Sequence, residues 1–217
     1  MTSSLLTLLG SLLLAPHLAS ATDYFFRFSG GNSIIHSQRL RGNFSIPLVA
    51  PGVAHAPYNP QDHYNRIYVN ETQSLAKTSL YIVPTNPHPP PVPGYYALWN
   101  VDGIPDVYRL VQTYWPEGDS EGRTFLYKEW NVRKTGDGDG SRTLLRYGCD
   151  LLGEWRWIAV REVNEPAGGN ERWVPYWVRP TAGNMEALAG WEYDVVDLEL
   201  VLATGPVNSN APGGVEE

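Results

Sequence analysis

Short runs of aromatic and β-branched residues recur along this chain, and Gly, Pro, Asn and Asp residues separate them. Such runs between turn-forming residues are typical of β-strands. No long window repeats its apolar residues with the helical period of about 3.6, although residues 184–189 could form one helical turn. We therefore predict an all-β fold of about eleven strands, at residues 24–28, 43–47, 66–70, 79–83, 95–100, 107–115, 125–133, 142–147, 154–162, 172–179 and 193–202.

Alternation within two of these strands predicts which side chains are buried. In residues 154–162, Trp155 and Trp157 share one face, and Ile158 lies on the other. In residues 193–202, the even-numbered positions from 196 onward are apolar, whereas the odd-numbered ones are mixed. One apolar and one mixed face suit both a sandwich and a closed barrel. The pattern therefore predicts an antiparallel β-sandwich or a trefoil-like barrel, and it does not choose between them.

A Pro-rich stretch at residues 84–93 interrupts the strands, with six prolines in ten residues. Proline lacks the backbone N–H that a sheet interior needs, so this stretch is expected to run over the surface as polyproline II. It is either a linker between domains or a rigid loop of one domain, and we favour the loop because the residues before it hold few strands. Residues 22–204 are thus predicted to be a single all-β domain, with a disordered tail at residues 205–217.

The first residues have the pattern of a secretory signal peptide. Residues 5–15 are mostly apolar and uncharged, a length that suits a signal-peptide core and is too short to span a bilayer. Small residues follow at Ala19, Ser20 and Ala21, as a signal peptidase requires. A buried N-terminal helix is the alternative interpretation. We expect residues 1–21 to be removed and the mature protein to be secreted and extracellular, with no membrane span.

The glycosylation triplets and the single cysteine bear on the prediction of an extracellular protein. Asn43 and Asn70 each begin an Asn-x-Ser/Thr triplet and are candidate glycosylation sites. Cys149 is the only cysteine, so an intramolecular disulfide is impossible. Its thiol is either buried in apolar surroundings or part of an intermolecular bridge, and no neighbouring base would activate it as a nucleophile.

Composition and charge narrow the functional classes. Hydrophobic residues make up 42% of the 217 residues and aromatic residues 12%, which is typical of a folded globular protein rather than a disordered chain. The net charge of −7 argues against a general nucleic-acid-binding protein. We expect neither nucleic acid nor a cofactor among its ligands.

Two loops contain residues of a catalytic or metal-binding motif but lack the other features that the motif requires. Residues 118–122 read Gly-Asp-Ser-Glu-Gly, but a G-x-S-x-G nucleophile needs a following helix, and a strand is predicted here. Residues 137–141 read Asp-Gly-Asp-Gly-Ser, but Arg142 and Gly148 stand where a calcium loop needs Gly and Glu. Both loops are predicted to be hairpin turns.

Other candidate chemistry lacks the spacing that a site requires. His55, Asp62 and His63 lie close in sequence, but without the fixed spacing of a metal or proton-transfer site. We predict no metal site and no catalytic residues. The alternative is a glycan hydrolase that uses two carboxylates, whose separation the sequence does not define, from among Glu117, Asp119, Glu121, Glu129, Asp150, Glu154, Glu162, Glu165 and Glu171.

The aromatic residues are the most informative feature. All eight tryptophans follow the Pro-rich stretch. Most of the rings are expected to fill a wide β core, but Trp and Tyr can also stack on sugars or anchor a protein partner. We predict that Trp173 and Trp177, beside Arg172 and Arg179, form an exposed binding surface.

The C-terminal part of the chain, about residues 94–204, resembles an uncharacterised family of small secreted proteins of filamentous ascomycete fungi. The similarity lies in a Trp-bearing strand, a Pro- and aromatic-containing strand and a closing strand, at residues 155–160 (Trp-Arg-Trp-Ile-Ala-Val), 173–177 (Trp-Val-Pro-Tyr-Trp) and 194–198 (Asp-Val-Val-Asp-Leu). Members often carry two cysteines near the places of Ala159 and Asp194, so the resemblance implies that a disulfide was lost here. The family has no agreed activity and therefore implies no catalytic residues.

These observations predict a secreted, non-catalytic protein that binds a polysaccharide or a protein partner outside the cell. Binding is expected to use exposed aromatic residues and loops. The alternatives are a glycan-directed hydrolase and a structural, wall-associated protein.

Overall fold

The computed structural model describes residues 23–42, 50–54, 63–64, 67–69, 79–82, 94–101, 104–114, 117, 125–148, 153–164 and 170–203. Several predicted features lie outside the described residues and stay predictions. They are the leader at residues 1–21, the two candidate glycosylation sites Asn43 and Asn70, the Pro-rich stretch at 84–93, the loop at 118–122, Cys149 and the tail at 205–217.

The described residues form fourteen strands, one short α-helix and one 3-10 helix. Aromatic and β-branched residues dominate the longer strands, where they pack well on a pleated surface. The strands are β1 (Asp23–Gly30), β2 (Arg41–Gly42), β3 (Val53–Ala54), β4 (His63–Tyr64), β5 (Ile67–Val69), β6 (Leu80–Ile82), β7 (Gly94–Asn100), β8 (Val107–Thr113), β9 (Phe125–Leu126), β10 (Trp130–Thr135), β11 (Arg142–Tyr147), β12 (Arg156–Asn164), β13 (Asn170–Val178) and β14 (Tyr193–Leu202). The helices are α1 (Ala182–Ala187) and η1 (Gly138–Gly140).

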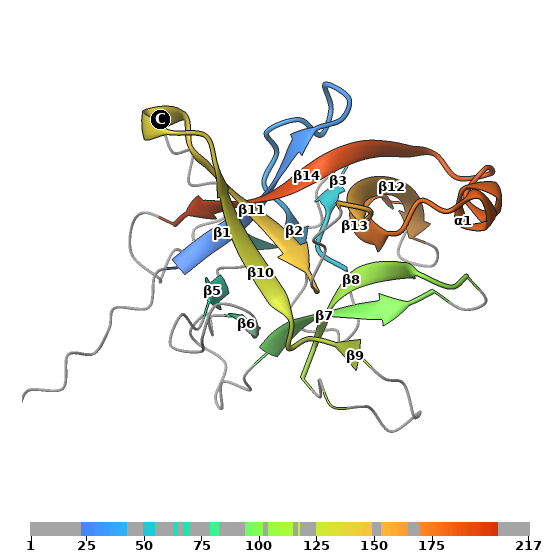
Figure 1. Cartoon of the computed structure of the whole chain (residues 1–217), viewed down its shortest axis with the longest axis horizontal. Helices are drawn as coiled ribbons and strands as arrows, with labels where there is room; N and C mark the ends of the chain where they lie inside the picture. Colours follow the sequence, from blue (N-terminus) through green and yellow to red (C-terminus); the bar gives the residue numbers. More distant parts are fainter. Residues whose placement is uncertain are drawn as a thin grey trace, which may run out of the picture.

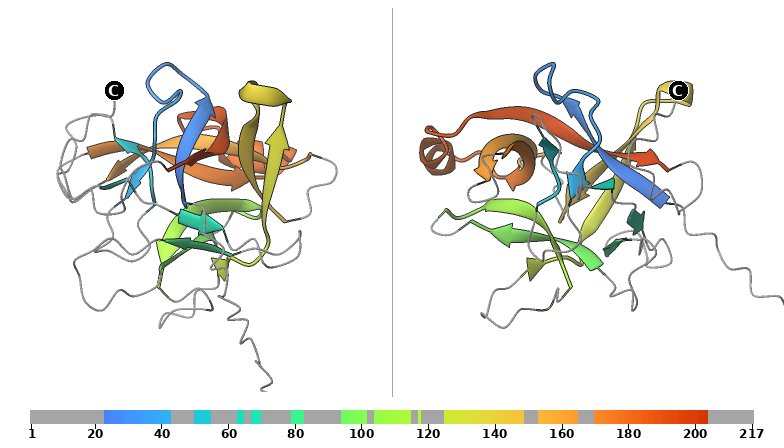
Figure 2. Two further views of the ribbon diagram at one scale, coloured as in Figure 1. Left: turned by 90° about the vertical axis from the view of Figure 1, so that its left-hand side faces the viewer. Right: turned by 180° about the vertical axis from the view of Figure 1, so that it is seen from behind.

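Twelve of these strands form one sheet, and the sheet closes on itself. Neighbouring strands follow the order β1-β5-β6-β7-β8-β13-β12-β14, and β14 pairs again with β1. All pairings in this ring are antiparallel. β14 and β1 therefore lie across the barrel from β7 and β8, as Figure 1 and Figure 2 show. The prediction of an antiparallel all-β fold with about eleven strands is confirmed, in its barrel form.

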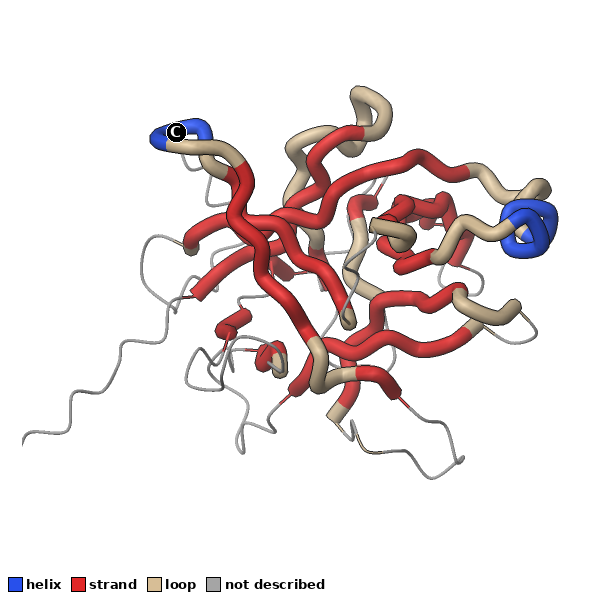
Figure 3. The backbone as a smooth tube through the Cα atoms, in the orientation of Figure 1, coloured by secondary structure: helices blue, strands red, loops and turns tan. Residues whose placement is uncertain are grey.

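A long hairpin, made of β10 and β11, projects from the barrel. β11 joins the barrel where Leu144 is opposite Glu199 of β14. η1 lies at the hairpin tip, which Figure 3 shows in blue, and Gly136 and Gly138 take positive φ values of 83° and 71° there. The turn predicted at residues 137–141 is thus confirmed. The single strand predicted at 125–133 is wrong, because β9 pairs with β7 whereas β10 pairs with β11.

Large aromatic side chains fill the barrel interior. Trp130, Trp157 and Trp177 are each at most 2% exposed. The rings of Trp130 and Trp157 stack with centroids 6.5 Å apart, and Trp157 lies 5.0 Å from Trp177. The alternation along β12 correctly predicts which side chains share a face, since Trp157 and Ala159 face this interior and Ile158 packs outside it.

A second apolar layer covers the outer face of β12 and β13. Val174 and Tyr176 pack there with Leu188 and Trp191, which follow α1. α1 begins after Thr181, whose hydroxyl accepts a hydrogen bond from the N–H of Asn184 and so caps the first turn. The helical turn predicted at residues 184–189 is therefore present and begins slightly earlier. With six residues, α1 is far too short to cross a bilayer, and no other helix in the described residues reaches that length.

Candidate binding surface

The predicted binding residues do not form an exposed surface. Trp173 and Trp177 are 3% and 2% exposed, and Arg172 is 8% exposed. Both rings belong to the interior core, because β13 lies between β8 and β12 and its odd-numbered residues face inward. The prediction that Trp173, Trp177 and Arg172 are exposed is therefore wrong. Arg179, just past the end of β13, is exposed as predicted.

A signal in the sequence of β13 points to this burial. Residues 173–178 read Trp-Val-Pro-Tyr-Trp-Val, which is an unbroken apolar run. A strand that is apolar at every position is typically buried on both faces. The structure agrees, because the odd-numbered rings face the interior and the even-numbered side chains pack with Leu188 in the outer layer.

Aromatic rings gather instead on the outer face of β6, β7 and β9. In β7, Tyr96 points into the barrel and is fully buried, so its neighbour Tyr95 points outward. The register places Tyr81 of β6 opposite Tyr95, and Phe125 of β9 opposite Trp99. Directly opposed residues of an antiparallel pair share a face. We call this surface the aromatic face, and it comprises Tyr81, Tyr95, Trp99, Phe125 and Tyr127.

Three tyrosines of the aromatic face form a row. The ring centroids of Tyr81 and Tyr95 lie 4.9 Å apart, and those of Tyr95 and Tyr127 lie 6.1 Å apart. Tyr81, Tyr95 and Trp99 are half-buried, whereas Phe125 and Tyr127 are buried. Tyr81 and Tyr95 therefore present part of their aromatic surface to solvent, beside the buried ring of Tyr127.

A charged pair borders the row. The Tyr127 hydroxyl donates to Oε1 of Glu117 at 3.0 Å, and Nζ of Lys128 lies 3.4 Å from the same oxygen. Lys128 also lies over the Tyr127 ring, 4.9 Å from its centroid. Hydrogen bonds from Tyr127 and Lys128 lower the pKa of the Glu117 carboxyl. Burial, together with the neighbouring phenols and carboxylate, raises the pKa of Tyr95, so its hydroxyl stays protonated near neutral pH.

Rings arranged in this way can contact sugars. A Tyr or Trp ring has a large apolar face, on which the C–H groups of a sugar can pack, and a polar edge that can hydrogen-bond sugar hydroxyls. Because the rings lie on the outer face of a sheet, an extended polymer can lie across them. The sequence carries a signal for this surface, since adjacent Tyr95 and Tyr96 in one strand must point to opposite faces.

The carboxylates needed by the hydrolase alternative are largely held by cations in the part of the chain that the structure describes. Oε1 of Glu162 accepts hydrogen bonds from Arg109 at 2.9 Å and from the Tyr176 hydroxyl at 2.6 Å. Burial and the nearby Glu162 carboxylate raise the pKa of Tyr176. Further pairs are Glu154–Arg179, Glu171–Arg161 and Glu117–Lys128. Glu129 is exposed, and the remaining four lie outside the described residues: Asp119, Glu121, Asp150 and Glu165.

The structure describes little of the His-containing segment. Of its three candidate residues, only the backbone of His63 in β4 is described, and His55 and Asp62 lie outside. Among the described residues, no three His, Cys, Asp or Glu side chains gather closely enough to hold a metal ion.

Comparison with known proteins identifies no relative. The chain matches no family model, no curated protein and no solved structure. The resemblance to a family of fungal secreted proteins stays a prediction. Function is therefore inferred from the chemistry of the barrel surface.

Proposed function

We propose that this chain is a secreted, non-catalytic protein that binds a polysaccharide through its aromatic face. The observation that carries the proposal is the row of Tyr81, Tyr95 and Tyr127 on the outside of a closed barrel. Other rings already fill the barrel interior. Tyr81, Tyr95 and Trp99 are partly exposed, and a group of partly exposed rings on one face is a candidate binding site.

The surroundings of the row favour a polysaccharide over a protein partner. Rings on neighbouring strands, about 4.8 Å apart, can contact successive sugar units of an extended chain. The tyrosine hydroxyls and the Glu117–Lys128 pair supply hydrogen-bond donors and acceptors for sugar hydroxyls.

The test compares polysaccharide binding by the wild-type protein and by the double variant Tyr81→Ala/Tyr95→Ala. The protein is recovered from the medium of a eukaryotic host, where we expect its first residue to be Thr22. It is incubated with cellulose, chitin, β-1,3-glucan and mannan, and the bound fraction is measured. We expect the wild type to bind at least one polymer and the variant to bind it about tenfold more weakly, a difference of about 1.4 kcal/mol.

Tyr193→Ala is the matched control, because Tyr193 is a half-buried ring that packs in the outer layer beside α1 and not in the aromatic face. Its affinity should match that of the wild type, and thermal melting should show that each variant is folded. An equal loss in both variants would contradict a role for the aromatic face. Release of soluble sugars by the wild type would contradict the non-catalytic assignment.

A further inference from the structure

A second distinct surface, rich in arginine, lies on the opposite side of the barrel. It is carried by outward-facing residues of β1, β14, β11 and β10, and the ring order places β14 directly across from β7 and β1 directly across from β8 (Figure 1). In these two strands Phe28 and Leu198 point inward and are fully buried, so the alternate residues Arg27 and Glu199 point outward. We call this surface the arginine face, and it comprises Arg27, Ser29, Arg133, Arg142, Arg146, Asp197 and Glu199.

Strand register aligns part of the arginine face in a row across four strands. Arg27 is opposite Glu199, Glu199 is opposite Leu144, and Leu144 is opposite Arg133. Three steps between strands separate Arg27 from Arg133, which corresponds to about 14 Å. The row is therefore long enough to contact several units of a polymer rather than a single small ion.

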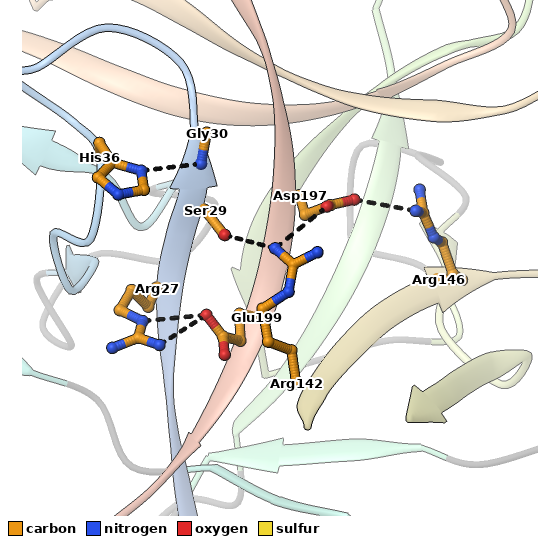
Figure 4. Close-up of polar contacts among 8 residues, drawn as sticks. All are labelled: Arg27, Ser29, Gly30, His36, Arg142, Arg146, Asp197 and Glu199. Atoms are coloured by element: carbon orange, nitrogen blue, oxygen red, sulfur yellow. Dashed lines mark hydrogen bonds and ion pairs between the residues drawn. The ribbon is translucent and has the colours of Figure 1, made fainter. Parts of the chain in front are cut away.

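Hydrogen bonds hold three of the four guanidinium groups of the arginine face in position, as Figure 4 shows. Nε and Nη2 of Arg27 both donate to Oε2 of Glu199, at 3.0 and 2.8 Å. Nη1 of Arg142 donates to Oγ of Ser29 at 2.7 Å. The same nitrogen lies 3.7 Å from Oδ2 of Asp197, whose Oδ1 accepts from Arg146 at 2.9 Å. Because these groups are already ordered, a ligand loses less conformational entropy when it binds them.

Two of the paired cations lie nearer to solvent than the carboxylates that hold them. The side chain of Arg27 is 33% exposed, against 7% for Glu199. The side chain of Arg142 is 44% exposed, against 28% for Asp197. Arg146 is no more exposed than Asp197 and lies over the Trp177 ring. A ligand that approaches this surface therefore meets the guanidinium groups of Arg27 and Arg142 before their carboxylates.

The arginine face also has an excess of positive charge. The face holds four arginines and two carboxylates, Asp197 and Glu199, which pair with three of the arginines, although the chain as a whole carries a net charge of −7. Arg133 is exposed, and its guanidinium forms no ion pair or hydrogen bond within the part of the chain that the structure describes. The other acidic residues of β1 and β14, Asp23 and Asp194, lie near the strand ends. The residues of the arginine face thus carry more positive than negative charge, opposite in sign to the whole chain, while Asp137 and Asp139 lie at the tip of the hairpin.

We propose that the arginine face binds a linear anionic polysaccharide, whose carboxylate or sulfate groups accept hydrogen bonds from the guanidinium groups. Planar guanidinium groups match such anions with two parallel hydrogen bonds. Leu144 and Phe25 are only 4% and 7% exposed, and Val195, on the same side of β14, is 53% exposed. None of the residues of the arginine face is an aromatic ring of the kind that anchors protein interfaces together with arginine. A nucleic-acid duplex, with one charge per about 1.7 Å, would be repelled by the net charge of −7 more strongly than a less densely charged polysaccharide such as polygalacturonate.

The test measures binding of the whole mature protein to polygalacturonate, which carries carboxylates, to heparin, which carries sulfates, and to uncharged dextran. The variant is Arg133→Gln/Arg142→Gln. The matched control is Arg156→Gln, which removes an exposed arginine of β12 that lies outside the arginine face. We expect the wild type to bind one or both anionic polymers and not dextran, with affinity that falls as salt is added. The double variant should bind about tenfold more weakly, and Arg156→Gln should bind like the wild type.

Several outcomes would overturn the proposal. They are no binding of either anionic polymer at low salt, equal weakening by Arg156→Gln and the double variant, or tighter binding of duplex DNA than of both polysaccharides. The variant Tyr81→Ala/Tyr95→Ala separates this site from the aromatic face. It should keep the wild-type affinity for the anionic polymer, because the two surfaces lie on opposite sides of the barrel.

Discussion

Trp157 and Trp130 each bury an indole ring in the barrel and donate its N–H to a backbone carbonyl. Trp157 Nε1 bonds the carbonyl of Leu145 at 2.6 Å, and Trp130 Nε1 bonds that of Tyr96 at 3.2 Å. Each ring fills a large volume without leaving its donor unpaired. The first bond joins β12 to β11 and the second joins β10 to β7, and neither of these strand pairs is directly paired in the described sheet. The indole N–H of a single tryptophan thus links two strands that share no backbone hydrogen bonds in the described sheet.

Ionisation of the Tyr147 side chain is expected to lower the stability of the fold at alkaline pH. Its ring packs edge-on against Trp130, 4.9 Å between centroids, and burial, followed by the Glu129 carboxylate, raises its pKa to about 12. A tyrosine in the unfolded chain titrates near pH 10. The folded state therefore holds this proton more tightly, so its contribution to stability is complete below about pH 10 and is lost as the pH rises through about 12.

We expect the free energy of unfolding of Tyr147→Phe to fall less steeply than that of the wild type between about pH 10 and 12, because phenylalanine has no hydroxyl to ionise. Urea unfolding at several pH values measures this. Identical slopes for the two proteins would show that Tyr147 titrates alike in the folded and unfolded states.

At the scale of elements, the hairpin of β10 and β11 depends on its turn. Gly138 has a φ of +71°, and a Cβ added there would meet no atom within 4 Å, so a side chain would cost conformational energy and cause no clash. Gly140, in the same turn, also has open space but no positive φ. Gly138→Ala should therefore destabilise the protein by about 1 kcal/mol, while Gly140→Ala should have little effect. Chemical unfolding measures both, and equal losses would rule out the left-handed backbone as the cause.

Most long strands were predictable, because their pattern is local. The predictions for β11 and β14 match the observed bounds, and those for β7, β8, β12 and β13 differ by one or two residues at their ends. The very short strands β2, β3 and β4 were missed, because two residues carry no period. The rings of β13 taken alone predict a binding surface, but the apolar residues between them bury that strand on both faces.

At the scale of the whole molecule, the barrel is closed by its first and last long strands. β1 pairs with β14 over seven residue pairs, from Tyr24 and Leu202 to Gly30 and Val196. Such a pairing joins residues far apart in sequence, and no local pattern specifies it. The class of the fold could therefore be predicted from the sequence, but not the ring order that separates the aromatic face from the arginine face.

Removal of β14 should abolish the fold, since β14 pairs with β12, β1 and β11 and supplies interior residues such as Leu198. We expect a chain ending at Glu192 to lack the near-UV circular dichroism of packed aromatic rings and to unfold without cooperativity. The control, a chain ending at Ala203, should unfold like the full-length protein. Cooperative unfolding of the shorter chain would show that the sheet does not need its closing strand.

The bond between the two ends of the barrel has a consequence for biogenesis. The N–H of Ala203 donates to the carbonyl of Asp23 at 2.8 Å, so the start and finish of the described fold are immediate neighbours. The ribosome synthesises β1 first and β14 last among the described strands, so these two strands cannot pair before β14 has left the ribosome. The barrel therefore closes only after all its other strands have been synthesised.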